Sequence, residues 1–142
     1  ILSQKYNVLK TDKHQNAEIG IAKCVLKDLK KEHEIFIVEM GAYNKGGIKF
    51  LTDIVKPDYG ILTGLNEQHL ATFGSLENII KTKLELIESL PEGGVAIFNG
   101  SNNIIWNLKD KINQYNDKLK KKVFCSITIF GSSKEAIYRY NI

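Results

Sequence analysis

The sequence predicts an α/β domain with a mostly parallel sheet and helices on both faces of the sheet. Short apolar, β-branched runs alternate with longer segments of helical period, which is typical of βαβ units. Two runs, Ile35–Val38 and Gly60–Leu62, are apolar on both faces, as strands covered from two sides must be. The chain has 142 residues, of which 43% are hydrophobic and 25% charged, enough for the core of one domain.

The strands expected from these runs are short and are separated by helical segments. In chain order they are Asn7–Lys10, Ile35–Met40, Tyr59–Thr63, Val95–Phe98, Phe124–Phe130 and Ile137–Tyr140. The opening residues, 1–6, have the pattern of the end of a helix whose beginning is missing. We therefore expect the chain to be a fragment.

Four helices are expected between the strands. Ala17–Lys31 should turn one face inward, and Gly46–Val55 is stopped by Pro57. The inward face of the first helix is expected to carry Ala22, Val25, Leu26 and Leu29. Ser75–Leu90 has the strongest helical pattern, and Ser101 or Asn102 can cap a last helix that runs to about residue 115.

Charge and cysteine content narrow the class of protein. The net charge of +4 comes from scattered residues, apart from a cluster at Lys118 and Lys120–Lys122. No aromatic residues interleave that cluster, so we expect a solvated loop and no nucleic-acid partner. Cys24 and Cys125 lack metal-site or disulfide spacing, and no apolar run approaches the roughly 18 residues of a membrane span. A soluble, cytoplasmic domain is expected.

Glu39 directly follows an apolar strand and so lies at the ligand side of an open α/β sheet. A carboxylate there is costly to desolvate unless it is paired, hydrogen-bonded or bound to a metal. The small residues Gly41 and Ala42 that follow Met40 would let a phosphate or a loop approach the backbone. The alternative is an ordinary strand-end carboxylate that faces solvent.

Lys83 falls near the middle of the apolar stripe of the helix Ser75–Leu90. That stripe consists of Leu76, Ile79, Ile80, Leu84, Leu86, Ile87 and Leu90. The side chain could lie along the core and bring its ammonium to the rim. The functional alternative is a buried lysine of lowered pKa, whose neutral amine takes up carbon dioxide to form a carbamate, an anion able to bind Mg²⁺.

His69 lies in the loop between the strand that ends at Thr63 and the helix that carries Lys83. A lone histidine in a polar loop is most often a surface residue. Glu39, His69 and the Lys83 helix nevertheless all follow strand ends on the presumed ligand side of one sheet. Mixed carboxylate, imidazole and carbamate ligation suits a divalent ion that also binds phosphates.

Five short segments, in order, carry a family resemblance. They are Asn16–Gly20, Val38–Ala42, Gln68–Leu70 with Phe73–Ser75, Thr82–Glu85, and Leu90–Asn99. They resemble consecutive motifs of the central domain of the Mur ligases, in register from about Val8 to Gly131. Within that family, the segments E-M-G-A and N-x-E-I-G are most similar to ligases that add D-alanyl-D-alanine to a UDP-N-acetylmuramoyl-tripeptide.

The resemblance implies a P-loop NTPase-like ATP-binding domain spanning residues 1–142, the middle one of three, with ATP and Mg²⁺ as cofactors. The peptide carboxylate of a UDP-muramoyl-peptide is phosphorylated, and the amine of D-alanyl-D-alanine attacks the acyl phosphate. By resemblance, Glu39 and His69 are Mg²⁺ ligands and Lys83 is the carbamylated lysine. Asn99 matches an adenine contact, and Asn16 matches a residue that faces the phosphates or the muramoyl substrate.

The sequence also departs from the family pattern. The glycine-rich phosphate loop is expected just before Ile1 and is absent, so the chain alone should be inactive. An acidic pair expected after Asn99 is replaced by Gly100–Asn102, and Gly47 and Ala71 stand where acidic residues are common. Two alternatives stay open. One is another amide ligase of the superfamily, folylpolyglutamate synthase-like or cyanophycin synthetase-like, and the other is a non-catalytic nucleotide-binding or scaffold domain.

Overall fold

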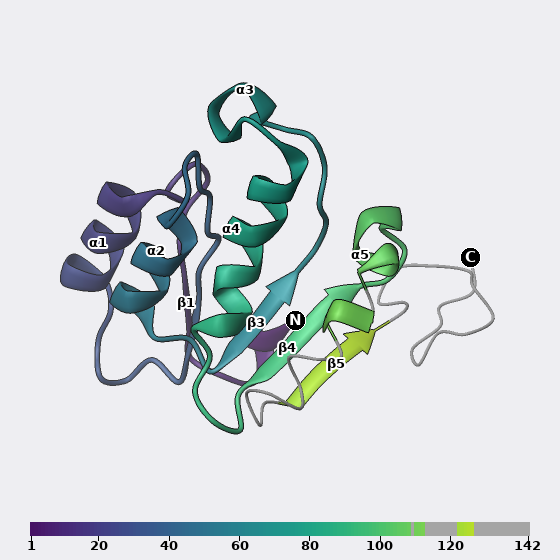
Figure 1. The fold of residues 1–142 in the computed structure, drawn as a ribbon. Coiled ribbons are helices and arrows are strands. Elements are labelled where there is room, and N and C mark those ends of the chain that lie inside the picture. The colour runs from purple at the N-terminus through teal and green to yellow at the C-terminus, as the bar shows by residue number, and fades with distance from the viewer. Residues whose placement is uncertain (109, 113–121, 127–142) are drawn as a thin grey trace.

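The computed structural model describes residues 1–108, 110–112 and 122–126, which fold as alternating strands and helices (Figure 1). After a 3-10 turn at Leu2–Gln4, the elements are β1 (Val8–Lys10), α1 (Glu18–Lys27), β2 (Ile35–Ile37), α2 (Gly47–Val55), β3 (Tyr59–Leu62), α3 (Leu70–Phe73), α4 (Leu76–Glu88), β4 (Val95–Asn99), α5 (Asn103–Asn107) and β5 (Lys122–Ser126). The expected α/β alternation is confirmed, and α3 is an additional short helix. Residues 118–121 of the lysine cluster and the expected strand Ile137–Tyr140 lie outside the described residues.

All strand pairs are parallel, as expected, but the described strands form two sheets where one was expected. β1 pairs with β2, and β3, β4 and β5 pair in that order. β2 is also shorter than the expected Ile35–Met40. Its partner β1 ends at Lys10, opposite Ile37, so the residues after Ile37 have no ladder to join. Met40 instead packs against the helices.

Helix α4 connects the two hydrophobic clusters of the fold. Leu84 and Ile87 belong to the cluster formed with β3, β4 and α5, and Ile79 belongs to the cluster formed with α1, α2 and α3. Ser75 begins the helix, because its hydroxyl accepts a hydrogen bond from the Asn78 amide at 3.2 Å. Figure 1 shows α4 between α2 and the three-stranded sheet. A residue in the middle of the buried face of α4 therefore lies where the two hydrophobic clusters meet.

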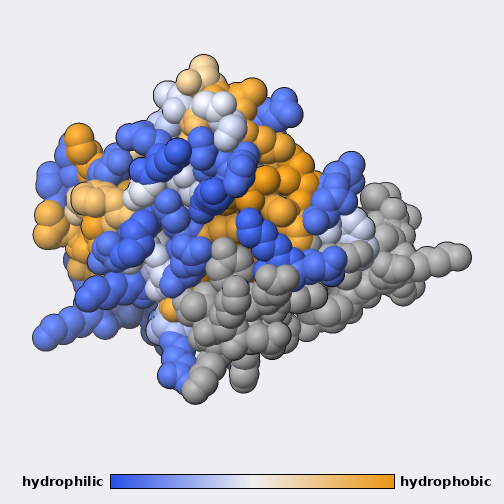
Figure 2. Space-filling model, viewed as in Figure 1, coloured by the Kyte–Doolittle hydropathy of each residue, from blue (hydrophilic) through white to orange (hydrophobic). Residues whose placement is uncertain are grey.

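The inward face of α1 matches the expected one only in part, since Val25 packs against the hydrophobic cluster but Leu26 and Leu29 are exposed. Ile21 and Cys24 are buried, whereas Leu26, expected inside, is 84% exposed. Apolar side chains are visible at the edge of the molecule that α1 occupies (Figure 2). Apolar residues lie on the exposed face of this helix as well as on its buried face, because Ile19 is exposed like Leu26. Periodicity alone could not decide between them, and packing against α2 selects the arc that contains Ile21.

The three-stranded sheet packs its helices closely on one face. A Cβ atom on Gly60 would lie 3.0 Å from Leu86 Cγ, so glycine permits this approach of β3 to α4. On the opposite face, Tyr59 and Ile61 are exposed. In the part of the chain that the structure describes, no helix is both long and apolar enough to cross a bilayer.

Candidate active site

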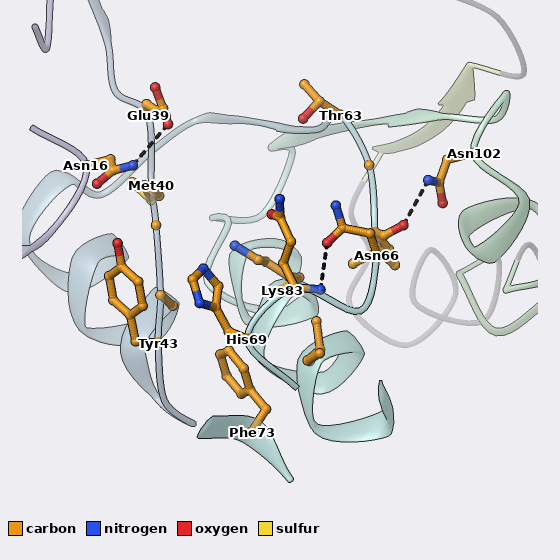
Figure 3. Close-up of a pocket in the computed structure, with 16 residues that line it drawn as sticks. Asn16, Glu39, Met40, Tyr43, Thr63, Asn66, His69, Phe73, Lys83 and Asn102 are labelled. Carbon is orange, nitrogen blue, oxygen red and sulfur yellow. Dashed lines mark hydrogen bonds between the residues drawn. The ribbon is translucent and has the colours of Figure 1, made fainter. Parts of the chain in front are cut away.

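One cavity of about 660 Å³ brings together four of the five residues singled out from the sequence. Its lining includes Asn16, Glu39, His69 and Lys83. They come from the segment before α1, the segment after β2, the loop after β3 and helix α4. Figure 3 shows that Asn16 and Glu39 approach the cavity from one side, and that Asn66 and Asn102 approach it from the other.

Asn16 and Glu39 form one wall of the cavity. Asn16 Nδ2 donates a hydrogen bond to Glu39 Oε1 at 3.1 Å, and the Gly41 amide donates to the Asn16 carbonyl at 2.7 Å. A Cβ atom on Gly41 would lie 3.2 Å from Asn16 Cγ and Nδ2, closer than a side chain normally approaches. Glycine at this position therefore lets Asn16 orient the Glu39 carboxylate, which itself is exposed.

Lys83 is half-buried at the cavity, between the two hydrophobic clusters. Burial lowers the pKa of its ammonium from the ordinary value of 10.5, and the nearby Glu39 carboxylate partly offsets this by favouring the charged form. A lowered pKa is the direction expected from one of the two alternatives that the sequence left open for Lys83. A larger fraction of neutral amine, the form that reacts with carbon dioxide, follows from the lowered pKa.

The lowered pKa of Lys83 predicts how stability depends on pH. Between the folded pKa and 10.5, the unfolded chain binds more protons at this position than the folded chain does. The free energy of unfolding of the wild type should therefore rise with pH through this window, relative to Lys83→Met, which cannot titrate there. Urea unfolding of both proteins from neutral pH to 10.5 tests this. A difference between them that does not change with pH would contradict it.

His69 has a tightly specified backbone and an aromatic neighbour. Its φ of 60° lies in the left-handed region, which is uncommon for a residue other than glycine. The His69 carbonyl accepts hydrogen bonds from the amides of Thr72 and Phe73, both at 3.0 Å, and from the Thr72 hydroxyl at 2.9 Å. The imidazole meets the Tyr43 ring edge-on, with centroids 4.9 Å apart. Tyr43 was not singled out from the sequence, because no local pattern places it beside His69.

Asn99 does not line this cavity. Its Nδ2 donates to the Thr63 carbonyl at 2.9 Å, and its Oδ1 accepts from the Ser101 amide at 3.0 Å. The first bond connects the end of β4 to the residue that follows β3, and the second is local to the turn after β4. Asn99 therefore shapes the cavity wall through Thr63.

Asn102 was expected from the sequence only as a possible cap of the last helix. It does cap α5, since its Oδ1 accepts from the Ile105 amide at 3.1 Å. Its Nδ2 also donates to the Leu65 carbonyl at 2.9 Å. Asn102 and Asn66 line both the main cavity and a second, more open cavity of about 540 Å³. The two cavities thus share a wall rich in amide groups.

Conventional metal ligands are too few to complete a site. Among the described residues, no group of three His, Cys, Asp or Glu side chains could hold a metal ion. The cavity offers one carboxylate, Glu39, and one imidazole, His69.

Parallel strands whose carboxyl ends open onto a polar cavity define a ligand-binding α/β domain. The chain belongs to the Mur ligase middle domain family, whose family model matches residues 1–141. It is 37% identical over 103 residues to the UDP-N-acetylmuramoyl-tripeptide--D-alanyl-D-alanine ligase of Escherichia coli K12, which covers 72% of this chain. It is 36% identical over 107 residues to the enzyme of the same name from Bacillus subtilis 168, which covers 75%.

Two solved structures share this fold. The fold matches that of the Thermotoga maritima MurF ligase in complex with ADP with a TM-score of 0.74, at 30% identity, over 86% of this chain and 26% of that one. A MurF structure from Acinetobacter baumannii matches in fold, with a TM-score of 0.73, over 86% of this chain and 25% of that one. The chain spans 23% of the length of the E. coli and B. subtilis relatives.

Proposed function

We propose that this chain is the ATP-binding middle domain of a ligase that joins D-alanyl-D-alanine to UDP-N-acetylmuramoyl-tripeptide in peptidoglycan synthesis. The names of the similar proteins support the substrates, and the ADP in the Thermotoga maritima complex supports the nucleotide. The observation that carries the proposal is the gathering of Asn16, Glu39, His69 and Lys83 around one cavity. In this account, the phosphate loop and the other two domains belong to other segments of a longer, cytoplasmic protein.

The proposed reaction has two steps. A substrate carboxylate oxygen attacks the γ-phosphorus of ATP, which forms an acyl phosphate and releases ADP. The amine of D-alanyl-D-alanine then attacks the acyl carbon, loses a proton and expels phosphate, which leaves an amide bond. The first step brings a carboxylate against a polyphosphate. The domain must therefore hold like charges together and keep them aligned.

The donor set fits Mg²⁺ if Lys83 is carbamylated. An ammonium at Lys83 would repel a cation, whereas a carbamate adds the anionic oxygen that Glu39 and His69 leave missing. Mg²⁺ would supply charge neutralisation at the phosphates. Asn16 orients Glu39 through their 3.1 Å hydrogen bond. Asn102 lines both cavities, and Asn99 bonds the carbonyl of Thr63, which lines the main one. In this proposal, that wall supports the nucleoside end of ATP.

The test is ATP-dependent phosphate release by the complete protein that contains this domain, with UDP-muramoyl-tripeptide and with or without D-alanyl-D-alanine. Release that requires both substrates is the expected result. Turnover only with another carboxylate and amine would assign the domain to a different amide ligase of the superfamily. No turnover with any pair would contradict an enzymatic role and favour a scaffold.

A further inference from the structure

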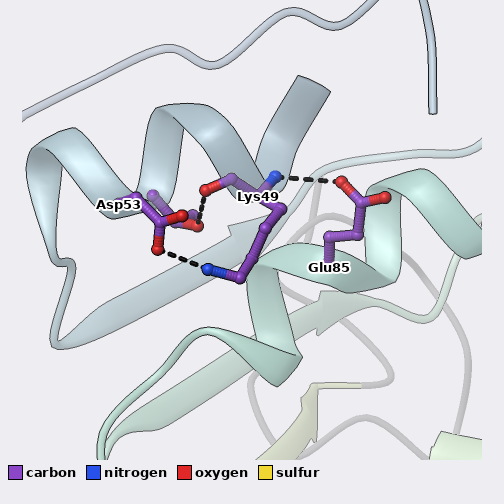
Figure 4. Close-up of polar contacts among 4 residues, drawn as sticks. Lys49, Asp53 and Glu85 are labelled. Atoms are coloured by element: carbon purple, nitrogen blue, oxygen red, sulfur yellow. Dashed lines mark hydrogen bonds and ion pairs between the residues drawn. The ribbon is translucent and has the colours of Figure 1, made fainter. Parts of the chain in front are cut away.

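The first turn of α2 is capped by a residue from a different helix. Its N-cap, Gly46, has a φ of 79° and no side chain, so α2 has no cap of its own. Glu85 of α4 provides one: Oε1 accepts from the Gly46 amide and Oε2 from the Lys49 amide, both at 2.9 Å. Figure 4 shows the bond from the Lys49 amide. A carboxylate at this end also interacts favourably with the helix dipole. We call these two hydrogen bonds the Glu85 clamp.

The clamp connects the two walls of the active-site cavity. Glu85 lies two residues after Lys83 on α4, and α2 follows the segment that runs from Glu39 to Tyr43 along the cavity. At its other end, this segment is tied to Asn16 by the Gly41 amide. It is therefore held both at Asn16 and at the Glu85 clamp.

No strand pairing fixes the distance between these walls in the described residues. Glu39 follows β2 and His69 follows β3, and the two strands belong to separate sheets. Apolar contacts of Ile48 and Ile79 join α2 to α4, but such contacts are not directional. The Glu85 clamp supplies a directional connection between the Lys83 helix and the Glu39 wall.

We propose that Glu85 is a positioning residue that sets the separation of Glu39 and Lys83, and thereby the affinity of the site for Mg²⁺·nucleotide. The inference rests on the function proposed above. Glu85 itself does not line the cavity. At about 100° per residue, Glu85 lies about 200° around α4 from Lys83, and so on the other side of the helix. Both of its carboxylate oxygens accept hydrogen bonds from backbone amides. It acts through the position of the backbone and not through contact with the ligand.

The test compares Glu85→Ala with Glu77→Gln in the complete protein. Glu77 is a matched control, since it lies on the same helix and forms an exposed pair with Lys81. Calorimetry with Mg·ADP is the primary measurement because it requires no peptide substrate. We expect Glu85→Ala to weaken binding about 10- to 100-fold, as a displaced ligand wall should. Glu77→Gln should leave binding unchanged.

A second variant separates positioning from simple helix capping. Glu85→Ala/Lys49→Gln places a glutamine at the third position of α2, from which it can reach back to the Gly46 amide. This local cap restores the end of α2 without connecting it to α4. Lys49→Gln alone is the control for loss of the exposed ion pair between Lys49 and Asp53.

We expect the double variant to regain thermal stability but not Mg·ADP affinity. Recovery of both, or wild-type affinity in Glu85→Ala, would overturn the inference. Failure of the proposed function is distinguishable from this outcome. A wild type that binds Mg·ADP but ligates no substrate pair would reject the function and still test the clamp. A wild type that binds no Mg·ADP would reject both.

Discussion

Lys83→Met is expected to lower ATP-dependent phosphate release by about 100- to 1000-fold, the cost of removing one group that stabilises charge in a transition state. Methionine keeps the apolar stem of the half-buried side chain but can form neither an ammonium nor a carbamate. Because the folded protein already disfavours the charged form of Lys83, the substitution should not lower the free energy of unfolding at neutral pH. Steady-state phosphate release and urea unfolding measure the two effects.

Lys81→Met is the matched control for this substitution. Lys81 lies on the same helix, one residue before Thr82, but it is exposed and pairs with Glu77 at 2.9 Å. Its replacement should change phosphate release by less than about 2-fold, since exposed pairs contribute little. Equal activity of both variants would show that Lys83 only fills space in the helix interface.

Glu39→Gln is expected to have the second largest effect. The substitution keeps an oxygen that can accept the hydrogen bond from Asn16 Nδ2, but it removes the negative charge. If Glu39 binds Mg²⁺, the concentration of Mg²⁺ that gives half-maximal activity should rise at least about 10- to 100-fold. A titration of phosphate release with MgCl₂ at saturating ATP measures this shift.

Glu92→Gln controls for the loss of one carboxylate elsewhere. Glu92 is exposed in the turn before β4 and does not line the cavity. It should leave the Mg²⁺ dependence unchanged. A Glu39→Gln variant with lower activity but an unchanged Mg²⁺ titration would contradict the assignment, because it would show that the Glu39 charge acts on a group other than Mg²⁺.

The helix that carries Lys83 could be predicted because its pattern is local. The apolar stripe and the Ser75 start signal fix both the extent of α4 and the half-buried position of Lys83. The alternation of elements and the parallel pairing also follow from short apolar runs between helical segments, but the division of the described strands into two sheets does not. For α1 the same reasoning was wrong about Leu26, because two apolar arcs compete and only packing against α2 decides between them.

The geometry of the cavity depends on contacts that connect distant parts of the chain. Tyr43 meets His69, Asn99 bonds the backbone of β3, and Glu85 caps α2 across 36 to 39 residues. None of these pairs has a sequence spacing that would suggest it. The sequence therefore identified which residues carry the chemistry more readily than which residues hold them in place.

The most direct test of the central claim is a crystal structure of the complete protein with Mg·ATP, grown with bicarbonate present. We expect a carbamate on Lys83 and a Mg²⁺ ion within about 2.0–2.1 Å of a Glu39 oxygen or of the carbamate, with His69 at the same site. An unmodified Lys83 ammonium, with Mg²⁺ held only by residues outside this cavity, would contradict it.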